Sequence, residues 1–252
     1  MKSRNLAALP IFNEQDHVHA VLDEVRLFAD HVLVIDDGST DETPQRLAER
    51  NDITVIRHQN NRGYGAALKS AFAFAASEGF EKLVTLDIIP TYDMWHRMDD
   101  KLAMKIWHWQ FLALKEPMPE LLIAKDPIGY IDYKMASWTK AKDMSAFDPR
   151  ALAHYHAFFS DPTRIHATCE DYRAGRTTDL ANDEADRKAG KKITVPLCAL
   201  WGTAGIPDAN GPLAIWKEWA TNITGSAIDS GHFVAEENPD ATAKAMLDFL
   251  TR

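Results

Sequence analysis

The stretch HVLVIDDGSTD, residues 31–41, indicates most directly how this chain folds. An apolar run of strand length ends in Asp36 and Asp37, and the residues that follow are typical of a turn and a helix N-cap. Carboxylates at the carboxyl end of a buried strand stand where open α/β sheets bind ligands. Taken alone, the same acidic turn is explained equally well by turn and capping chemistry.

Strand-like and helix-like runs alternate on both sides of this stretch, which is the rhythm of βαβ units. The patterns predict strands at 6–12, 31–35, 54–57 and 82–86, and helices at 16–28, 43–49 and 65–77.

The kind of residue changes after residue 87, because all seven tryptophans lie beyond it. From there to about residue 187 the sequence is rich in aromatic residues and has helical patterns. Beyond that, the patterns predict strands at 194–201 and 227–230 and a closing helix at 240–250. We therefore predict an α/β fold with a mainly parallel, doubly wound sheet and a helical cap inserted between sheet strands.

The composition is that of an ordinary globular protein. Of 252 residues, 46% are hydrophobic and 26% are charged, and the formal net charge is -9 with a pI near 5.5. We expect no nucleic-acid partner, because phosphate backbones are bound by clustered Lys and Arg. The two cysteines, Cys169 and Cys198, have no zinc-binding spacing. The sequence contains no signal-peptide core and no apolar run of membrane-spanning length, so we expect a cytoplasmic protein without a membrane span.

The N-terminal third resembles the nucleotide-sugar half of family-2 glycosyltransferases of the polyprenyl-phosphate sugar transferase type. The resemblance rests on LPIFNEQDHV (9–18), VIDDGSTDET (34–43), NRGYGAALKSAF (61–72) and LVTLD (83–87). It implies that a nucleotide-binding cleft is lined or bordered by Asn13, Glu14, Asp36, Asp37, Arg62 and Gly63.

That family also needs a metal-binding Asp-x-Asp motif, because the cation neutralises the leaving diphosphate. Asp87 begins the motif, but Ile89 stands where the second carboxylate belongs. We therefore assign no metal ligands, and a divalent metal and a nucleotide-sugar are implied only under a transferase interpretation.

From Asp87 onward the sequence resembles haloacetate dehalogenases, including fluoroacetate dehalogenases, of the α/β-hydrolase fold. The residues that carry the resemblance are LDIIPTYDMW (86–95), KIWHWQF (105–111), ASWTKAKDMSAFDP (136–149), CEDYRAG (169–175), LCALWG (197–202) and SGHFVAEENPD (230–240). Together the two resemblances imply that the chain has three regions. These are a transferase-like half-sheet at 1–87, a helical cap at 88–190, and a hydrolase half-sheet carrying the catalytic base at 191–252.

In such enzymes a carboxylate displaces the halide, and a histidine then activates water to hydrolyse the ester intermediate, with no cofactor. The resemblance implies that His232 is the base and Asp87 the acid that orients it, with Asp208 as a fallback for the acid. It also implies halide-binding roles for His108, Trp109 and Tyr172. Each has a plainer explanation by itself: a turn residue for His232, a polar strand exit for Asp87, and helix core for the other three.

The nucleophile is missing from this pattern. Hydrolases of this fold carry it on a glycine-rich strand-to-helix turn, and the chain contains neither GxSxG nor GxDxG. Transferase-like sequence occupies the place before Asp87 where that turn belongs. Superposing the strand orders puts Glu14 nearest to His232, which is a hypothesis. We expect impaired or absent haloacetate turnover.

Two other interpretations remain open: a nucleotide-sugar-dependent glycosyltransferase remnant, and a non-catalytic fusion or artificial chimera. A small haloacid or a nucleotide-sugar is the ligand expected under the two enzymatic interpretations. The dehalogenase resemblance also implies a homodimer.

Overall fold

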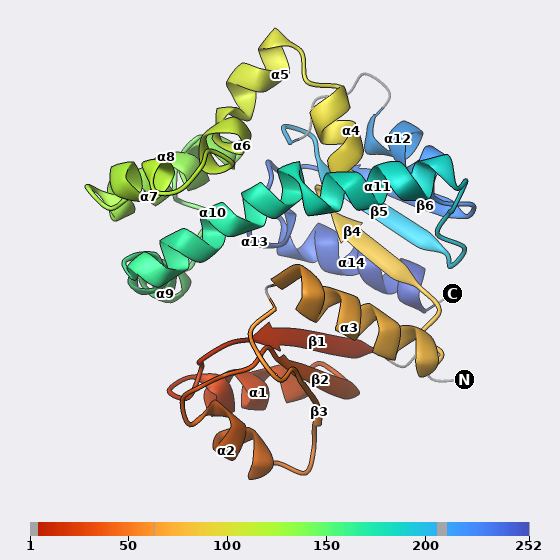
Figure 1. Cartoon of the computed structure of the whole chain (residues 1–252). Coiled ribbons are helices and arrows are strands. Elements are labelled where there is room, and N and C mark those ends of the chain that lie inside the picture. Colours follow the sequence, from red (N-terminus) through yellow and green to blue (C-terminus); the bar gives the residue numbers. More distant parts are fainter. Residues whose placement is uncertain (1–4, 63, 206–210, 252) are drawn as a thin grey trace. The chain divides into compact units, whose positions relative to one another are not determined.

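The computed structural model describes residues 5–62, 64–205 and 211–251, and the chain divides into two compact units. The N-terminal unit spans Met1–Glu81 and the C-terminal unit spans Lys82–Arg252 (Figure 1).

The N-terminal unit is a three-stranded parallel sheet in the order β1-β2-β3 with a helix after each strand. Its elements are β1 (Leu6–Ile11), α1 (Val18–Arg26), β2 (His31–Asp36), α2 (Thr43–Ala48), β3 (Thr54–Arg57) and α3 (Tyr64–Ser77). All seven predicted elements up to residue 86 exist, with ends that differ by a few residues.

Side chains of the central strand β2 face both sides of this sheet, because successive residues of a strand point to opposite faces. Val32 and Val34 pack in one cluster with side chains of α1 and α2. Leu33 and Ile35 pack on the other side with Ala67 and Ala71 of α3. A strand buried on both faces explains the unbroken apolar run in its sequence.

The C-terminal unit holds a second parallel sheet, in the order β4-β5-β6. Its strands are β4 (Leu83–Leu86), β5 (Leu197–Gly202) and β6 (Ile223–Ile228), and its helices near the sheet are α12 (Gly211–Trp219), α13 (Val234–Glu237) and α14 (Pro239–Leu250).

Successive side chains of β5 also point to opposite faces of its sheet. Leu197 and Ala199 pack with Ile215 and Trp216 of α12, whereas Cys198 and Leu200 pack against α14. Helices therefore cover both faces, and the predicted parallel, doubly wound α/β arrangement is confirmed in each unit.

Eight helices separate β4 from β5, as the sequence predicts for an inserted cap (Figure 1). They are α4 (Thr91–His96), α5 (Asp100–Lys105), α6 (Trp107–Leu112), α7 (Met118–Ile123), α8 (Pro127–Trp138), α9 (Pro149–Phe159), α10 (Pro162–Arg176) and α11 (Thr178–Lys188). Part of this insert has a hydrophobic cluster of its own, formed by Leu112, Ile123, Phe159, Ile165 and Cys169. In the described part of the chain, no helix combines the length and apolarity needed to cross a bilayer.

The last strand differs from the prediction of 227–230, because β6 begins at Ile223 and ends at Ile228. Gly225 inside it would ordinarily argue against a strand. Here a side chain at this position would collide with the backbone of Ala199 on β5, so glycine permits the close approach of the two strands.

Candidate functional site

Asp87 lies directly after β4, in a left-handed backbone conformation with φ of 48°. Its N–H donates to the carbonyl of Leu200 at 2.7 Å, and its Oδ1 accepts the N–H of Gly202 at 3.0 Å. The side chain is 1% exposed. A non-glycine residue held in this conformation and bonded on both sides to β5 is typical of a functional site.

His232 lies in the loop after β6, and its Nδ1 is 2.7 Å from Oδ2 of Asp87. A carboxylate only accepts hydrogen bonds, so Nδ1 carries the ring proton and Nε2 has a free lone pair. The imidazole is 40% exposed, which leaves Nε2 accessible. The predicted acid and base are therefore brought together in the geometry of an oriented general base.

Three glycines allow the backbone to close around this pair. A Cβ at Gly205 would lie 2.6 Å from Oδ2 of Asp87, and one at Gly231 would lie 2.6 Å from the carbonyl carbon of Thr139. One at Gly202 would meet the carbonyl carbon of Gly231 at 2.6 Å. None of these positions accepts a larger residue without movement of the site.

The three residues assigned to halide binding converge inside the cap. The His108 ring lies 5.6 Å from that of Tyr172, and the Trp109 ring lies 5.7 Å from the same tyrosine, both edge to face. Trp138 connects this group to the base, because its ring is 4.7 Å from His108 and 5.2 Å from His232.

The electrostatics of this group favour neutral hydrogen-bond donors. Burial, assisted by the charges of Lys134 and His232, lowers the pKa of His108 to about 3. Burial also raises the pKa of Tyr172 well above its usual range, with a smaller contribution from Asp171. A neutral imidazole and an un-ionised phenol suit an anion better than a carboxylate or phenolate would.

Two residues of α8 escaped the sequence analysis. The ring of Trp138 lies between those of His108 and His232, and Lys134 is buried with its Nζ 3.1 Å from Nδ1 of His108. Their i, i+4 spacing puts both on one face of α8. The available signal was a lysine among the apolar and aromatic residues of IDYKMASW (131–138).

In the N-terminal unit, Asp37 is buried and holds neighbouring segments together. Its Oδ1 lies 2.6 Å from Nδ1 of His58, and both oxygens accept the N–H of Arg62. Asp36 is fully buried, with Oδ2 3.1 Å from Nε of Arg57. Sequence analysis missed His58 and Arg57, although both lie at the carboxyl end of β3.

Asn13, which has a φ of 56°, and Glu14 stand at the end of β1 and tie it to the acidic turn. Ser39 Oγ accepts the N–H of Asn13, Asn13 Oδ1 accepts the N–H of Thr40, and Thr43 Oγ1 accepts the N–H of Glu14. Most nucleotide-assigned residues therefore contribute to a network around one turn.

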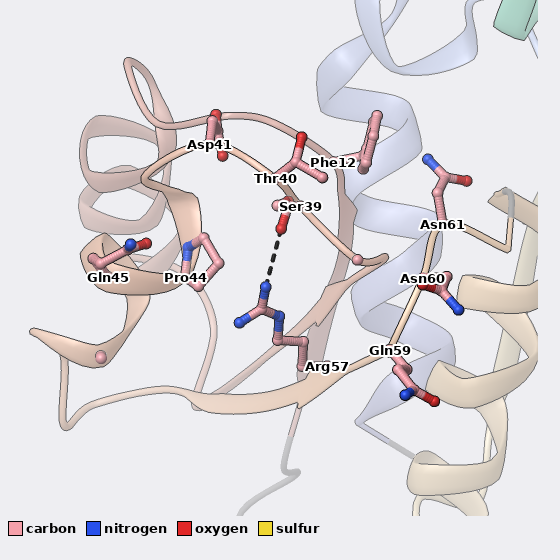
Figure 2. A pocket seen from close by; sticks show the side chains of 12 residues that line it. Phe12, Ser39, Thr40, Asp41, Pro44, Gln45, Arg57, Gln59, Asn60 and Asn61 are labelled. Carbon is pink, nitrogen blue, oxygen red and sulfur yellow. Dashed lines mark hydrogen bonds between the residues drawn. The ribbon is translucent and has the colours of Figure 1, made fainter.

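A cavity of about 740 Å³ opens beside that turn (Figure 2). Figure 2 shows Arg57 inside it, with an N–H donated to the carbonyl of Ser39 at 3.0 Å. Thr40 and Asp41 line it on the turn side, and Asn61 lines it from the segment after β3.

The residues after β4 do not fit a divalent metal. Both oxygens of Asp87 are engaged, by Gly202 and His232, and Ile89 is a buried apolar side chain. Within residues 5–62, 64–205 and 211–251, three or more His, Cys, Asp or Glu side chains nowhere gather as metal ligands.

Three assignments concern positions outside these observations. Gly63 and Asp208 lie outside the described residues. The proximity of Glu14 and His232 joins residues of two units and stays a prediction.

Comparison with known proteins finds two families. The family model for glycosyl transferase family 2 matches residues 7–97. Fluoroacetate dehalogenase from Burkholderia sp. is 35% identical over 170 residues, which are 67% of this chain and 55% of that protein. Soluble epoxide hydrolase from Corynebacterium sp. is 28% identical over 199 residues, 78% of this chain and 66% of that protein.

Solved structures agree with the second part of this result. A protein from Nostoc sp. PCC 7120, assigned as an α/β hydrolase, has a TM-score of 0.67 and 35% identity, over 94% of this chain and 71% of that one. The two resemblances drawn from the sequence are thus both confirmed. The chain spans 55% of the dehalogenase's length, less than two thirds of it.

Proposed function

The chain belongs to the α/β-hydrolase family, and from that premise we propose that its C-terminal unit keeps the base, the orienting acid and the halide pocket of a haloacid dehalogenase, with turnover impaired or absent. The observation that carries the proposal is the bond of 2.7 Å between Asp87 and His232, next to a cluster of neutral aromatic donors.

In the proposed chemistry, Nε2 of His232 takes a proton from water while Asp87 stabilises the imidazolium that forms. His108, Trp109 and Tyr172 would donate hydrogen bonds to the departing halide, on which negative charge builds. Water activation needs only residues of the C-terminal unit, whereas the halide departs only as a carboxylate forms an ester bond to the carbon that bears it.

Turnover is impaired because the carbon-attacking carboxylate has no recognisable counterpart. Covalent catalysis requires a carboxylate on a tight turn with glycines around it. The sequence of the 86 residues before Asp87 contains neither GxSxG nor GxDxG, and the family-2 glycosyltransferase match covers most of them. Water activation by His232 then has no ester intermediate to hydrolyse.

The test is halide release from fluoroacetate and chloroacetate, followed by ion chromatography over many hours. We expect release no faster than in buffer. The matched control is His232→Asn, which removes the base and keeps a polar side chain of similar size. Sustained release that His232→Asn abolishes would contradict the impairment. A second measurement, bromide quenching of tryptophan fluorescence, tests the halide pocket itself, and we expect saturable quenching.

A nucleotide-binding remnant is the second candidate, and the cavity beside residues 38–41 favours it. Arg57, whose Nε is paired with Asp36, lines this cavity and is the cation that we propose for a diphosphate. Calorimetry with a nucleoside diphosphate, with and without Mg²⁺, tests it: binding lost in Arg57→Gln supports this candidate, and no heat in either condition removes it.

Homodimer formation, which the dehalogenase resemblance implies, is part of the same proposal. Light scattering after size exclusion would give the mass of a dimer of the 28.3 kDa chain. A monomer at micromolar concentration would remove it.

A further inference from the structure

Lys134 is a charged side chain in an unusual place, the interior of the cap. It is 2% exposed, which puts it among the largest fully buried side chains of the described residues. Its Nζ lies 4.7 Å from the ring centroids of both Trp107 and Trp138. No hydrogen bond or ion pair in the described part of the chain gives it a carboxylate partner.

Burying an ammonium group is costly, and two aromatic faces offset that cost only partly. Burial lowers the pKa of Lys134 to about 8, so the side chain is still mostly protonated at pH 7. A protonated lysine has three donors and no lone pair.

The described partner for those donors is Nδ1 of His108, at 3.1 Å. His108 is neutral at pH 7, because its pKa is lowered to about 3. A neutral imidazole has one N–H and one lone pair. Nδ1 must present the lone pair to the ammonium, and the ring proton is therefore on Nε2.

We propose that Lys134 is a positioning residue of the cap: its ammonium holds His108 as the Nε2–H tautomer and puts a positive charge behind that donor. The consequence is an anion pocket whose donor is fixed in direction and backed by a full charge that no carboxylate among the described residues neutralises. The assignment of the His108 tautomer depends only on the contacts of Lys134. The role of Lys134 in anion binding rests on the function proposed above.

The first experiment measures the tautomer in the unaltered protein, by ¹⁵N NMR of histidine-labelled chain at pH 7. His108→Phe identifies the signals by their disappearance. We expect Nδ1 to resonate as an unprotonated, pyridine-like nitrogen and Nε2 as a protonated one. A protonated Nδ1 would overturn the proposal, and this result needs no variant of Lys134 to fold.

Two substitutions then separate hydrogen bond from charge. Lys134→Gln keeps a neutral N–H donor near Nδ1, so we expect the tautomer to persist. Lys134→Met removes the donor as well, so we expect the two tautomers to mix. Near-UV circular dichroism checks packing. Lys125→Met is the matched control, because it removes an exposed lysine of the same cap and should alter neither signal.

The anion part is read from bromide quenching of tryptophan fluorescence. We expect both Lys134→Gln and Lys134→Met to weaken bromide affinity on the order of tenfold, because a nearby unit charge is lost. Lys125→Met should leave it unchanged, and equal affinity in all four proteins would overturn this part. If the unaltered protein binds no bromide, the proposed halide pocket fails, and the tautomer result is judged separately by NMR.

Discussion

Asp87 is the residue on which the geometry of the site depends most. It receives an N–H from Gly202, holds His232, and occupies space that Gly205 leaves open. Because its own backbone is in the left-handed region, the carboxylate reaches both partners without extending into solvent.

Gly205→Ala should disturb this residue directly. The added Cβ would lie 2.6 Å from Oδ2 of Asp87, so the carboxylate must shift. We expect a loss of about 1–3 kcal/mol in the free energy of unfolding, measured by urea denaturation. Gly175→Ala is the control, because its nearest neighbour lies 3.8 Å away in ordinary contact and helix α10 gains an alanine. Equal stability of the two variants would contradict the prediction.

His108 should make the C-terminal unit sensitive to acid. Its pKa is lowered to about 3 in the folded state, so between that value and about 6.5 the unfolded chain binds more protons than the folded one. Stability therefore falls as the pH drops through this window, by about 3 kcal/mol from pH 6.5 to pH 4.

Unfolding curves of the unaltered protein and His108→Phe at these two pH values check the sign. The variant should lose much less stability on acidification, since phenylalanine cannot bind the proton. Parallel pH dependence of the two proteins would contradict the assignment of the effect to His108.

At the scale of elements, the cap depends on contacts between helices more than on the regularity of each one. Arg173 of α10 donates to Glu120 of α7 from Nη1 at 2.7 Å and from Nη2 at 3.0 Å. That guanidinium lowers the pKa of Glu120 to about 2. Both side chains are largely buried, at 15% and 16% exposed, so this bidentate pair ties the two helices together.

Glu120→Gln should lower the free energy of unfolding by about 1–3 kcal/mol, because it leaves the shielded guanidinium of Arg173 without its carboxylate partner. Glu170→Gln is a matched control, since Glu170 contacts the same arginine but is 54% exposed. Glu170→Gln should lower the free energy of unfolding by less than about 1 kcal/mol. Thermal melting of both variants at neutral pH compares them, and a larger shift for Glu170→Gln would be the contrary result.

At the scale of the whole molecule, the two units have separate hydrophobic clusters. Leu33 is buried in a cluster of the N-terminal unit and Leu197 in one of the C-terminal unit. Each sheet therefore stabilises its own unit.

Leu33→Ala and Leu197→Ala should each lower the free energy of unfolding of their unit by about 2–5 kcal/mol, because each leaves a cavity in a hydrophobic cluster. We expect faster amide hydrogen exchange mainly in the unit that carries the substitution. Val55→Ala, at a position that is 40% exposed, is the control and should change exchange little. Acceleration spread evenly over both units after either substitution would show that they unfold together.

The sequence alone determined the α/β class, the inserted helical cap and the two family resemblances. Apolar periodicity reports which residues face a core, and Asp87 and His232 follow strands whose carboxyl ends share an edge. These are local signals, which explains why the strand β6, interrupted by Gly225, was misplaced by a few residues.

The tertiary structure alone decided which side chains meet across elements. Lys134 and His108 are 26 residues apart on α8 and α6, and Asp37 and His58 are 21 apart on neighbouring strand ends. The packing of one helix on another, or of one strand end beside the next, sets such contacts, and no short-range pattern records it. The charge behind His108 therefore became evident only from the folded cap.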